Sequence, residues 1–559
     1  MQKPLVGVTR HNLVRELSAG VTLLAIAIPL NIGYAQIAGL PATAGLYALV
    51  LPTILYVIFV SSRQVVASPD AAAAALVASS VGGLAAAGSN DYLTLALAQA
   101  IICGVMFLLL AFFKLGFLAN FLSKPILIGF VGGLALDILM SQIAKMLGIS
   151  LDSGGEFVQK VSDLVSGLGS LNGWSLAISA VCVTVLLFGK KFLRIVPWAL
   201  VVMIAATLVV LWAGLAARGV AVLGDVPAGA PKLTWPTIEW QSWLLLIPSA
   251  MALTMVTTAE GLLVSRSYAE KRHYRTIPNR DLLAFGVANI ASGMQGSFAV
   301  GSSTSRTAAM DQAGSRTQLP SVVLAGGTLL LLLFGTGLLE GIPSPAIGAI
   351  VGVAILPLLG FTELRALWKL DRFEFAIGAE CFLVTLFVGS IPGILVAFVL
   401  ALINLARRAS NPAIDVLTAD DQPSASLLDD APPGEVTAPG VLVIRMAAPL
   451  FFANGDVFSS AVRSAVTAAG PGAVRNVVID MEAVTDVDVT AAESFESLVE
   501  WLDGEQISLA FSRLRSSDHE RFTKLGILGD RAVYQTNRAA VAALIDRPDS
   551  GEEAGTQHG

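Results

Sequence analysis

Residues 298–310, FAVGSSTSRTAAM, place five hydroxyl side chains beside one arginine, Arg306, in a chain that is 55% hydrophobic. Hydroxyl groups and the free N–H groups of a helix N-terminus can donate hydrogen bonds to the oxygens of an anion. Small hydroxyl residues also let membrane helices pack closely, so this pattern alone fits packing equally well. A charged side chain inside a membrane segment is costly and usually functional, and Arg306 therefore favours an anion site. The hydroxyls belong to Ser302, Ser303, Thr304, Ser305 and Thr307.

A second segment, VVASPDAAAAAL at residues 65–76, has the same order of features. Ser68 is predicted to cap a helix there, with Pro69 at its first position, and Ser302 or Ser303 is predicted to cap the other. A helix that begins within the membrane directs unpaired N–H groups and about half a positive charge at the space before it. Two such ends facing each other across a void would hold an anion between them.

The elements that must position these residues are membrane helices. Mean hydropathy is +0.74, only 14% of residues are charged, and the apolar segments before residue 409 are long enough to cross a bilayer. Those at 70–86 and 303–314 are short and interrupted at matching places in the two halves, which indicates an inverted-repeat transporter. We predict fourteen segments, at 17–40, 45–61, 70–86, 93–113, 121–144, 174–189, 195–216, 243–266, 281–296, 303–314, 319–339, 343–360, 373–390 and 391–406.

The charges between these segments orient the chain. With a cytoplasmic N-terminus, only four basic residues before residue 409 fall outside: Lys145, Lys160, Arg218 and Lys232. Both termini are therefore predicted to lie in the cytoplasm, in a multi-pass protein of the inner (plasma) membrane. The net charge of -6 and the lack of a basic stripe argue against a nucleic-acid partner. Cys103, Cys182 and Cys381 lie in apolar segments, and we expect no disulfide, metal site or cofactor.

Three stretches resemble the SulP family of sulfate-permease-type anion transporters: 20–48, 61–77 and 286–318. The resemblance implies fourteen transmembrane segments in a seven-plus-seven inverted repeat, with a core domain that moves against a gate domain. It also implies a homodimer and a substrate held between the N-termini of the third and tenth helices. The residues at matching positions, which are the predicted substrate-binding residues, are Tyr34, Pro69, Asp70, Ala71, Ser303, Thr304, Ser305 and Arg306. Leu30 stands where many members have Gln, and Asn31 is expected to supply that amide.

Glu260 lies within the eighth predicted segment, where many family members have an acid. We interpret it as a coupling site for H+, because a positive charge offsets the entry of an anion; Na+ and a purely structural cap remain open. Asp70 would repel an anion, so we expect its carboxylate to turn aside or to pair. Ion pairs of Arg306 with Glu260 or with Asp70 are two further hypotheses.

The region after the membrane segments is soluble in composition. We divide the chain into a cytoplasmic N-terminus (1–16), a transporter domain (17–408), a linker (409–437), a small α/β domain (438–548) and a disordered tail (549–559). Strands are predicted at 441–446, 476–481 and 507–511, with helices between them. VIDMEAVTDVDVTAAESFESLVEWL resembles the STAS domain that follows SulP transporters. Val489 and Thr490 follow Asp488 where stand-alone relatives carry a phosphorylatable serine, which argues against that switch.

The leading hypothesis is a secondary active transporter, not an enzyme, that carries a small anion by alternating access in a membrane. Sulfate, bicarbonate, chloride and C4-dicarboxylates all fit a cradle of amides and hydroxyls. The alternatives are a Na+-coupled bicarbonate transporter, an uncoupled anion channel or exchanger, a nucleobase carrier of the same fold, and a membrane sensor that signals through the tail.

Overall fold

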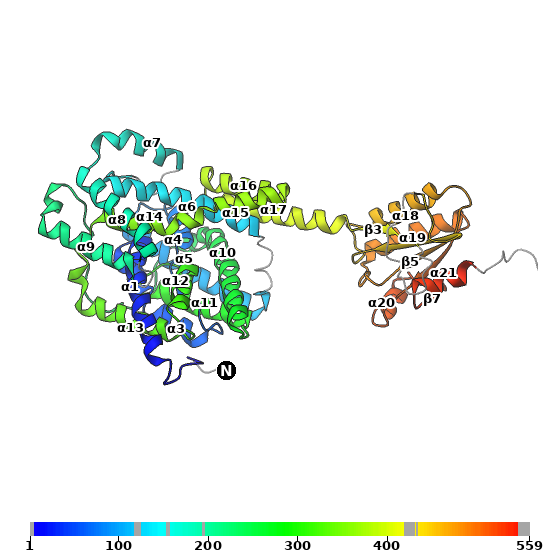
Figure 1. Cartoon of the computed structure of the whole chain (residues 1–559), viewed down its shortest axis with the longest axis horizontal. Helices are drawn as coiled ribbons and strands as arrows, with labels where there is room; N and C mark the ends of the chain where they lie inside the picture. Colours follow the sequence, from blue (N-terminus) through cyan, green and yellow to red (C-terminus); the bar gives the residue numbers. More distant parts are fainter. Residues whose placement is uncertain are drawn as a thin grey trace, which may run out of the picture. The chain divides into compact units, whose positions relative to one another are not determined.

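The computed structural model describes residues 5–116, 124–151, 157–192, 196–418, 431 and 434–545. The chain divides into two compact units, Met1–Ala401 and Leu402–Gly559 (Figure 1). The first is helical, and the second is an α/β domain. Helix α17 (Ser390–Ser410) carries the chain from one into the other.

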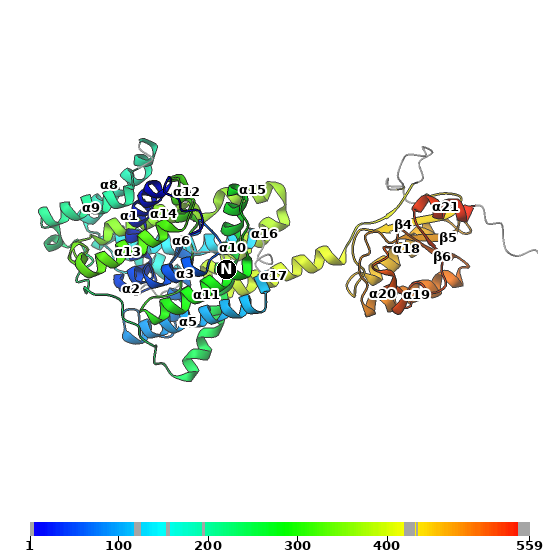
Figure 2. The ribbon, with the colours of Figure 1, turned by 90° about the horizontal axis from the view of Figure 1, so that it is seen from below.

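One group of helices in the first unit surrounds the two broken segments. Helix α11 packs along α5 and α3, while α1 packs along α13 (Figures 1 and 2). Glycines allow the closest approach, since a Cβ at Gly104 of α5 would lie 2.8 Å from the carbonyl oxygen of Gly286 in α11. The members are α1 (Leu13–Ile37), α2 (Ala42–Tyr47), α3 (Leu51–Phe59), α4 (Ala71–Val81), α5 (Asn90–Phe112), α10 (Trp240–Arg272), α11 (Pro278–Met294), α12 (Thr304–Gln312) and α13 (Leu319–Phe334).

A second group of helices packs around α6. A Cβ at Gly129 of α6 would lie 2.1 Å from the carbonyl oxygen of Gly378 in α16, so these helices meet backbone to backbone. Helix α14 packs against both α6 and α8. The group comprises α6 (Lys124–Leu147), α7 (Phe157–Gly167), α8 (Gly173–Phe192), α9 (Trp198–Trp212), α14 (Ser344–Ile355), α15 (Phe361–Leu370), α16 (Arg372–Phe387) and the first part of α17.

Each of the fourteen predicted membrane segments contains helix. Within the described ranges, six helical runs are long and apolar enough to cross a membrane, two of which join shorter helices (Ala42–Phe59 and Ser344–Leu370), and the pair α7 and α8, bent by 117°, would add a seventh. Others, including α4, α9 and α13, are apolar but shorter. The fourteen-span count and the seven-plus-seven repeat therefore stay predictions. The three cysteines are buried and unpaired, as their apolar surroundings predict.

The second unit has a five-stranded sheet in the order β3-β4-β5-β6-β7. Strand β3 (Ile414–Val416) is antiparallel to β4 (Gly440–Met446), whereas β5 (Val474–Asp480), β6 (Ser508–Ser512) and β7 (Val533–Tyr534) continue in parallel. Alternate residues of β4 bury opposite faces: Leu442 packs with α18 (Gly455–Ala469), α19 (Val489–Gly504) and α20 (His519–Lys524), and Val443 with α21 (Asn537–Ile545). The three predicted strands are confirmed.

Candidate functional site

The two broken segments meet as a short antiparallel ladder. Strand β1 (Ala67–Ser68) pairs with β2 (Gly301–Ser302), so that Ala67 lies opposite Ser302. The backbone N–H of Ser303 donates to the carbonyl of Val66 at 2.9 Å. Helices α4 and α12 begin within three residues of these strands, and their N-termini therefore lie side by side.

The helix caps differ in part from the prediction. Ser68 does not cap α4, because its backbone is held in the ladder with β2. Asp70 is the cap instead, and its carboxylate accepts the N–H of Ala73 at 2.7 Å. Pro69 consequently precedes the helix, and Ala71 is its first residue. Ser303 caps α12 by accepting the N–H of Arg306 at 3.4 Å.

Helix α10 packs against the β1–β2 ladder where there are two glycines, Gly301 in β2 and Gly261 in α10. A Cβ at Gly301 would lie 2.7 Å from a carboxylate oxygen of Asp70 and 3.3 Å from the Cγ2 of Thr257. A Cβ at Gly261 would lie 2.8 Å from the ring of Phe285. The absence of side chains at both positions lets the ladder, the cap of α4 and α10 approach one another.

Arg306 is buried between the two helix tips, with only 1% of its surface exposed. Its Nε donates to the hydroxyl of Ser303 at 2.7 Å, and its Nη2 donates to the carbonyl of Pro69. The guanidinium carbon lies 5.6 Å from the ring centroid of Tyr34. Its Nη1 has no hydrogen-bond partner in the described structure. The guanidinium thus links α12, α1 and the segment before α4.

The hypothesised ion pairs of Arg306 are not formed. Within the described part of the chain, neither Asp70 nor Glu260 forms a salt bridge with it. Asp70 turns its carboxylate to the N-terminus of its own helix, and Arg306 finds neutral oxygens instead. The positive charge is therefore held without a carboxylate partner.

Other polar groups around the tips also lack partners. The hydroxyls of Ser68, Ser302 and Thr258 are buried and accept or donate no hydrogen bond among the described residues. By contrast, Thr304 and Ser305, the first two residues of α12, are exposed. The open surface at this place is therefore the outer edge of the α12 N-terminus.

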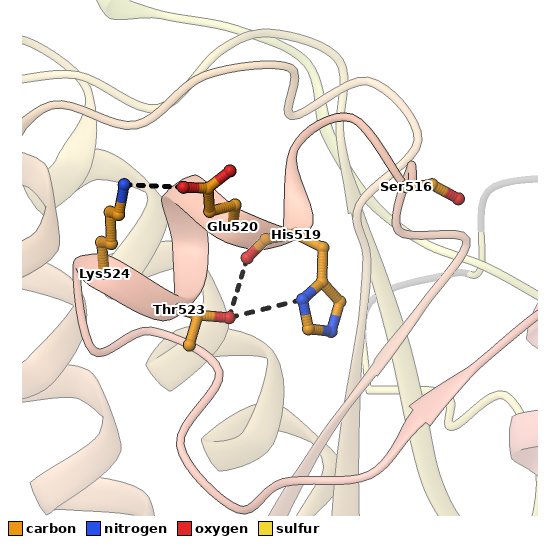
Figure 3. A pocket seen from close by; sticks show the side chains of 5 residues that line it. All are labelled: Ser516, His519, Glu520, Thr523 and Lys524. Carbon is orange, nitrogen blue, oxygen red and sulfur yellow. Dashed lines mark hydrogen bonds and ion pairs between the residues drawn. The ribbon is translucent and has the colours of Figure 1, made fainter.

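The side chain of Arg306 lies buried at the place where the void between the two tips is predicted. Two hollows of the described chain lie in the tail domain. One is a shallow surface hollow where Glu520 pairs with Lys524 and Thr523 bonds His519 (Figure 3). The residues at the helix tips that reach the surface are Thr304 and Ser305, which are exposed, and Asp70, which is half-buried.

The remaining predicted residues lie on α1 and α10. Tyr34 is 5% exposed and carries its ring next to Arg306. Asn31 is fully buried, donates to the carbonyl of Ala27 at 2.7 Å, and leaves its Oδ1 without a partner. Glu260 is half-buried beside Gly261, and no hydrogen bond or ion pair joins it to another described residue. The structure thus gathers Tyr34, Pro69, Asp70, Ser303 and Arg306 at one place.

A charge cluster that the sequence analysis did not predict lies at the other end of α12. The carboxylate of Asp311 accepts from Lys271 at 2.8 Å, from Arg316 at 3.2 Å and from Gln64 at 3.1 Å, and it also pairs with Arg272. These partners come from the end of α10, the approach to β1 and the loop after α12. The cluster fixes the half-helix whose other end carries Arg306.

An ion pair also joins α6 to α7. Asp137 of α6 binds Lys160 of α7 at 2.8 Å, and the side chain of Lys160 is 7% exposed. Among the described residues, no three His, Cys, Asp or Glu side chains lie close enough together to hold a metal ion.

Similarity to known proteins covers nearly the whole chain. The sulfate permease family matches residues 13–380, and the STAS domain matches residues 435–540. A protein of Mycobacterium tuberculosis (strain CDC 1551) named "Probable sulfate transporter" is 33% identical over 539 residues, which is 95% of each chain. The chloroplastic sulfate transporter 4.1 of Arabidopsis thaliana is 27% identical, over 92% of this chain and 77% of that protein.

Solved structures show the same fold at low identity. The murine SLC26A9 anion transporter in the inward-facing state superposes with a TM-score of 0.86 at 20% identity, covering 97% of this chain and 92% of that one. The transmembrane domain of the cyanobacterial bicarbonate transporter BicA superposes with a TM-score of 0.61 at 21% identity, covering 71% and 100%. Together with the two family matches, these findings show that the chain belongs to the sulfate permease family and carries a STAS domain.

Proposed function

We propose that the chain is a secondary active transporter of a small anion, with sulfate as the first candidate, and not an enzyme. One observation carries the proposal: two helix N-termini meet around a fully buried arginine that has no carboxylate partner. The names of the relatives, sulfate transporters of bacteria and plants, support sulfate as the anion to test first.

Charge accounts for the preference for anions. Each helix N-terminus contributes about half a positive charge, and the guanidinium of Arg306 adds one more. The carboxylate of Asp70, at the tip of α4, is bound to the N–H of Ala73. A cation would meet net repulsion there, whereas an anion would be attracted. The exposed hydroxyls of Thr304 and Ser305 and their backbone N–H groups are the donors that would face the solute.

The two helix groups are proposed to act as the core and gate domains. The broken segments belong to the first group, so a movement of that group would carry the anion site past the second. The groups contact each other through α1 with α9 and α14, and through α4 with α6. Lys145 of α6 donates to Gln36 at the end of α1 at 3.1 Å, a polar contact that such a movement would break.

Glu260 is proposed to bind the coupling ion, with H+ as the first choice. Its position on the helix behind the anion site and its lack of a described partner support this role. Na+-coupled bicarbonate transport is the second candidate, because the solved transmembrane domain of BicA, a bicarbonate transporter, has the same fold. We further propose a homodimer in the plasma membrane with both termini cytoplasmic, and a regulatory or dimer-supporting role for the STAS domain.

Flux into proteoliposomes tests these proposals. The purified chain would be reconstituted and offered labelled sulfate, bicarbonate, chloride and a C4-dicarboxylate, with and without pH or Na+ gradients. A carrier predicts saturable uptake and counterflow of the preferred anion, whereas a channel predicts flux without counterflow. Binding without flux would contradict transport and favour the sensor hypothesis.

A further inference from the structure

Helix α15 has an apolar edge that the described part of the chain covers only in part, through Phe382 beside Phe361 and Phe375 beside Trp368. Only Leu367 of this helix is buried, and Leu364 is half-buried. Phe361 and Trp368 are 58% and 49% exposed, although they are among the largest apolar side chains of the helix. Residues seven apart lie on the same side of a helix, so these two rings form one stripe.

A basic edge runs next to that apolar stripe. Arg365 and Lys369 are four residues apart, both are exposed, and neither has a hydrogen bond or ion pair with another described residue. Arg372, at the start of α16, lies with its guanidinium carbon 5.0 Å from the ring centroid of Trp368. Three cations therefore flank a single exposed indole.

The nearby carboxylates do not neutralise this edge. Glu363 lies about 160° around the helix from Arg365, at about 100° per residue. Asp371 uses its carboxylate to cap α16, accepting the N–H groups of Phe373 at 2.8 Å and Glu374 at 3.2 Å. Glu374 itself is half-buried on α16. The exposed charge beside Trp368 is consequently positive.

Around the axis of α15, the order is a buried side, then an exposed aromatic stripe, then a basic edge. A helix at the surface of a bilayer needs this order, with its rings at the boundary of the acyl chains and its basic ends among the phosphates. Helix α15 ends the run Ser344–Leu370, which is long and apolar enough to cross a membrane, and α16, a predicted membrane segment, begins two residues later. The basic end of α15 therefore lies where the chain turns between two spans, at the membrane surface.

We propose that α15 binds the phosphate of an anionic phospholipid between Arg365 and Lys369, with Trp368 and Phe361 in the interface beneath it. The positive-inside distribution assigns this helix to the cytoplasmic leaflet, whose anionic lipids attract basic residues. Among the described residues near this edge, Asp371 is bound at the cap of α16 and Glu363 lies on the other side of α15, so the edge favours an anionic over a zwitterionic headgroup. This site does not depend on which anion is transported.

The fluorescence of Trp368 tests the proposal in the full chain. Its emission is obtained as the difference between the wild type and Trp368→Phe in vesicles of phosphatidylcholine that contain brominated phosphatidylglycerol or brominated phosphatidylcholine. Each basic residue near an anionic surface strengthens association about fivefold, so the pair predicts a preference for phosphatidylglycerol of about 30-fold at low ionic strength. Added salt should reduce that preference in the wild type.

Two double variants, each of which removes two positive charges, distinguish binding at α15 from a general attraction of the chain to anionic lipid. In Arg365→Gln with Lys369→Gln, both brominated lipids should quench Trp368 equally. Arg475→Gln with Arg515→Gln removes two exposed charges from the tail domain and should leave the preference intact. Equal quenching in the wild type would overturn the anionic site. No quenching by either lipid would show that a protein surface, such as a second copy of the chain, covers α15 instead.

Discussion

Arg306→Lys separates the charge of the proposed anion site from its geometry. The guanidinium donates from two different nitrogens to two acceptors, the hydroxyl of Ser303 and the carbonyl of Pro69. A lysine keeps the positive charge but carries one nitrogen, which cannot occupy both donor positions. The variant should therefore loosen the link between the two helix tips while leaving the potential positive.

The size of the effect follows from the bond that is lost. A hydrogen bond from a charged donor contributes about 1.5–3 kcal/mol, and about 1.4 kcal/mol corresponds to a tenfold change. Arg306→Lys should therefore reduce sulfate kcat/KM by about 10- to 150-fold. Arg306→Gln also removes the charge, whose attraction for an anion 4 Å away is about 4 kcal/mol at an effective dielectric constant of 20, and uptake should fall to background.

Initial rates of sulfate uptake into proteoliposomes, measured over a range of concentrations, give both constants. Monodisperse elution in detergent and an unchanged melting temperature would show that the variants are folded. Arg266→Lys, at an exposed position of α10, is the matched control and should behave as the wild type. If Arg306→Lys keeps KM and the maximal rate within twofold of the wild type, donation from two guanidinium nitrogens is not needed for transport.

Three further changes address coupling, packing and the tail. Glu260→Gln should abolish accumulation driven by a proton gradient while anion exchange continues, and accumulation that persists in gradient-driven uptake would contradict the coupling role. Gly301→Ala places a Cβ 2.7 Å from the carboxylate that caps α4, and it should slow uptake more than fivefold, whereas Gly326→Ala, with open space around it, should not. Asp480→Ala leaves Arg513 without its buried acceptor and should destabilise the tail domain by about 2 kcal/mol in denaturant melts.

Structural elements could be predicted from the sequence where the residues that determine them lie within one short segment. The interrupted segments, a serine cap at Ser302 or Ser303 and the strands of the tail all follow from residue types a few positions apart, and the structure places the cap at Ser303. The cap of α4 shows the limit of this reasoning. Ser68 and Asp70 are both good capping residues, and the choice between them depends on the pairing of Ser68 with Gly301, which lies in the other half of the chain.

Contacts between segments far apart in the chain could not be predicted from the sequence. The acceptor of Arg306 is a backbone carbonyl, that of Pro69, and every residue type offers one, so no side-chain pattern identifies it. Opposite charge suggested Asp70 and Glu260 as partners, but the N–H of Ala73 at the start of α4 holds the nearer carboxylate. The partners of Asp311 likewise come from three separate segments.

The choice of neutral acceptors for Arg306 has a consequence for selectivity. A buried arginine paired with a carboxylate would present no net charge to a solute, and an anion would have to displace that carboxylate in order to bind. Here a carbonyl and a hydroxyl hold the guanidinium, while Asp70 is bound to its own helix. The positive charge therefore stays without a carboxylate partner, and the buried Nη1 has no acceptor in the described structure. A mobile anion is the partner that would complete this arrangement, because it supplies both the missing negative charge and the missing acceptor.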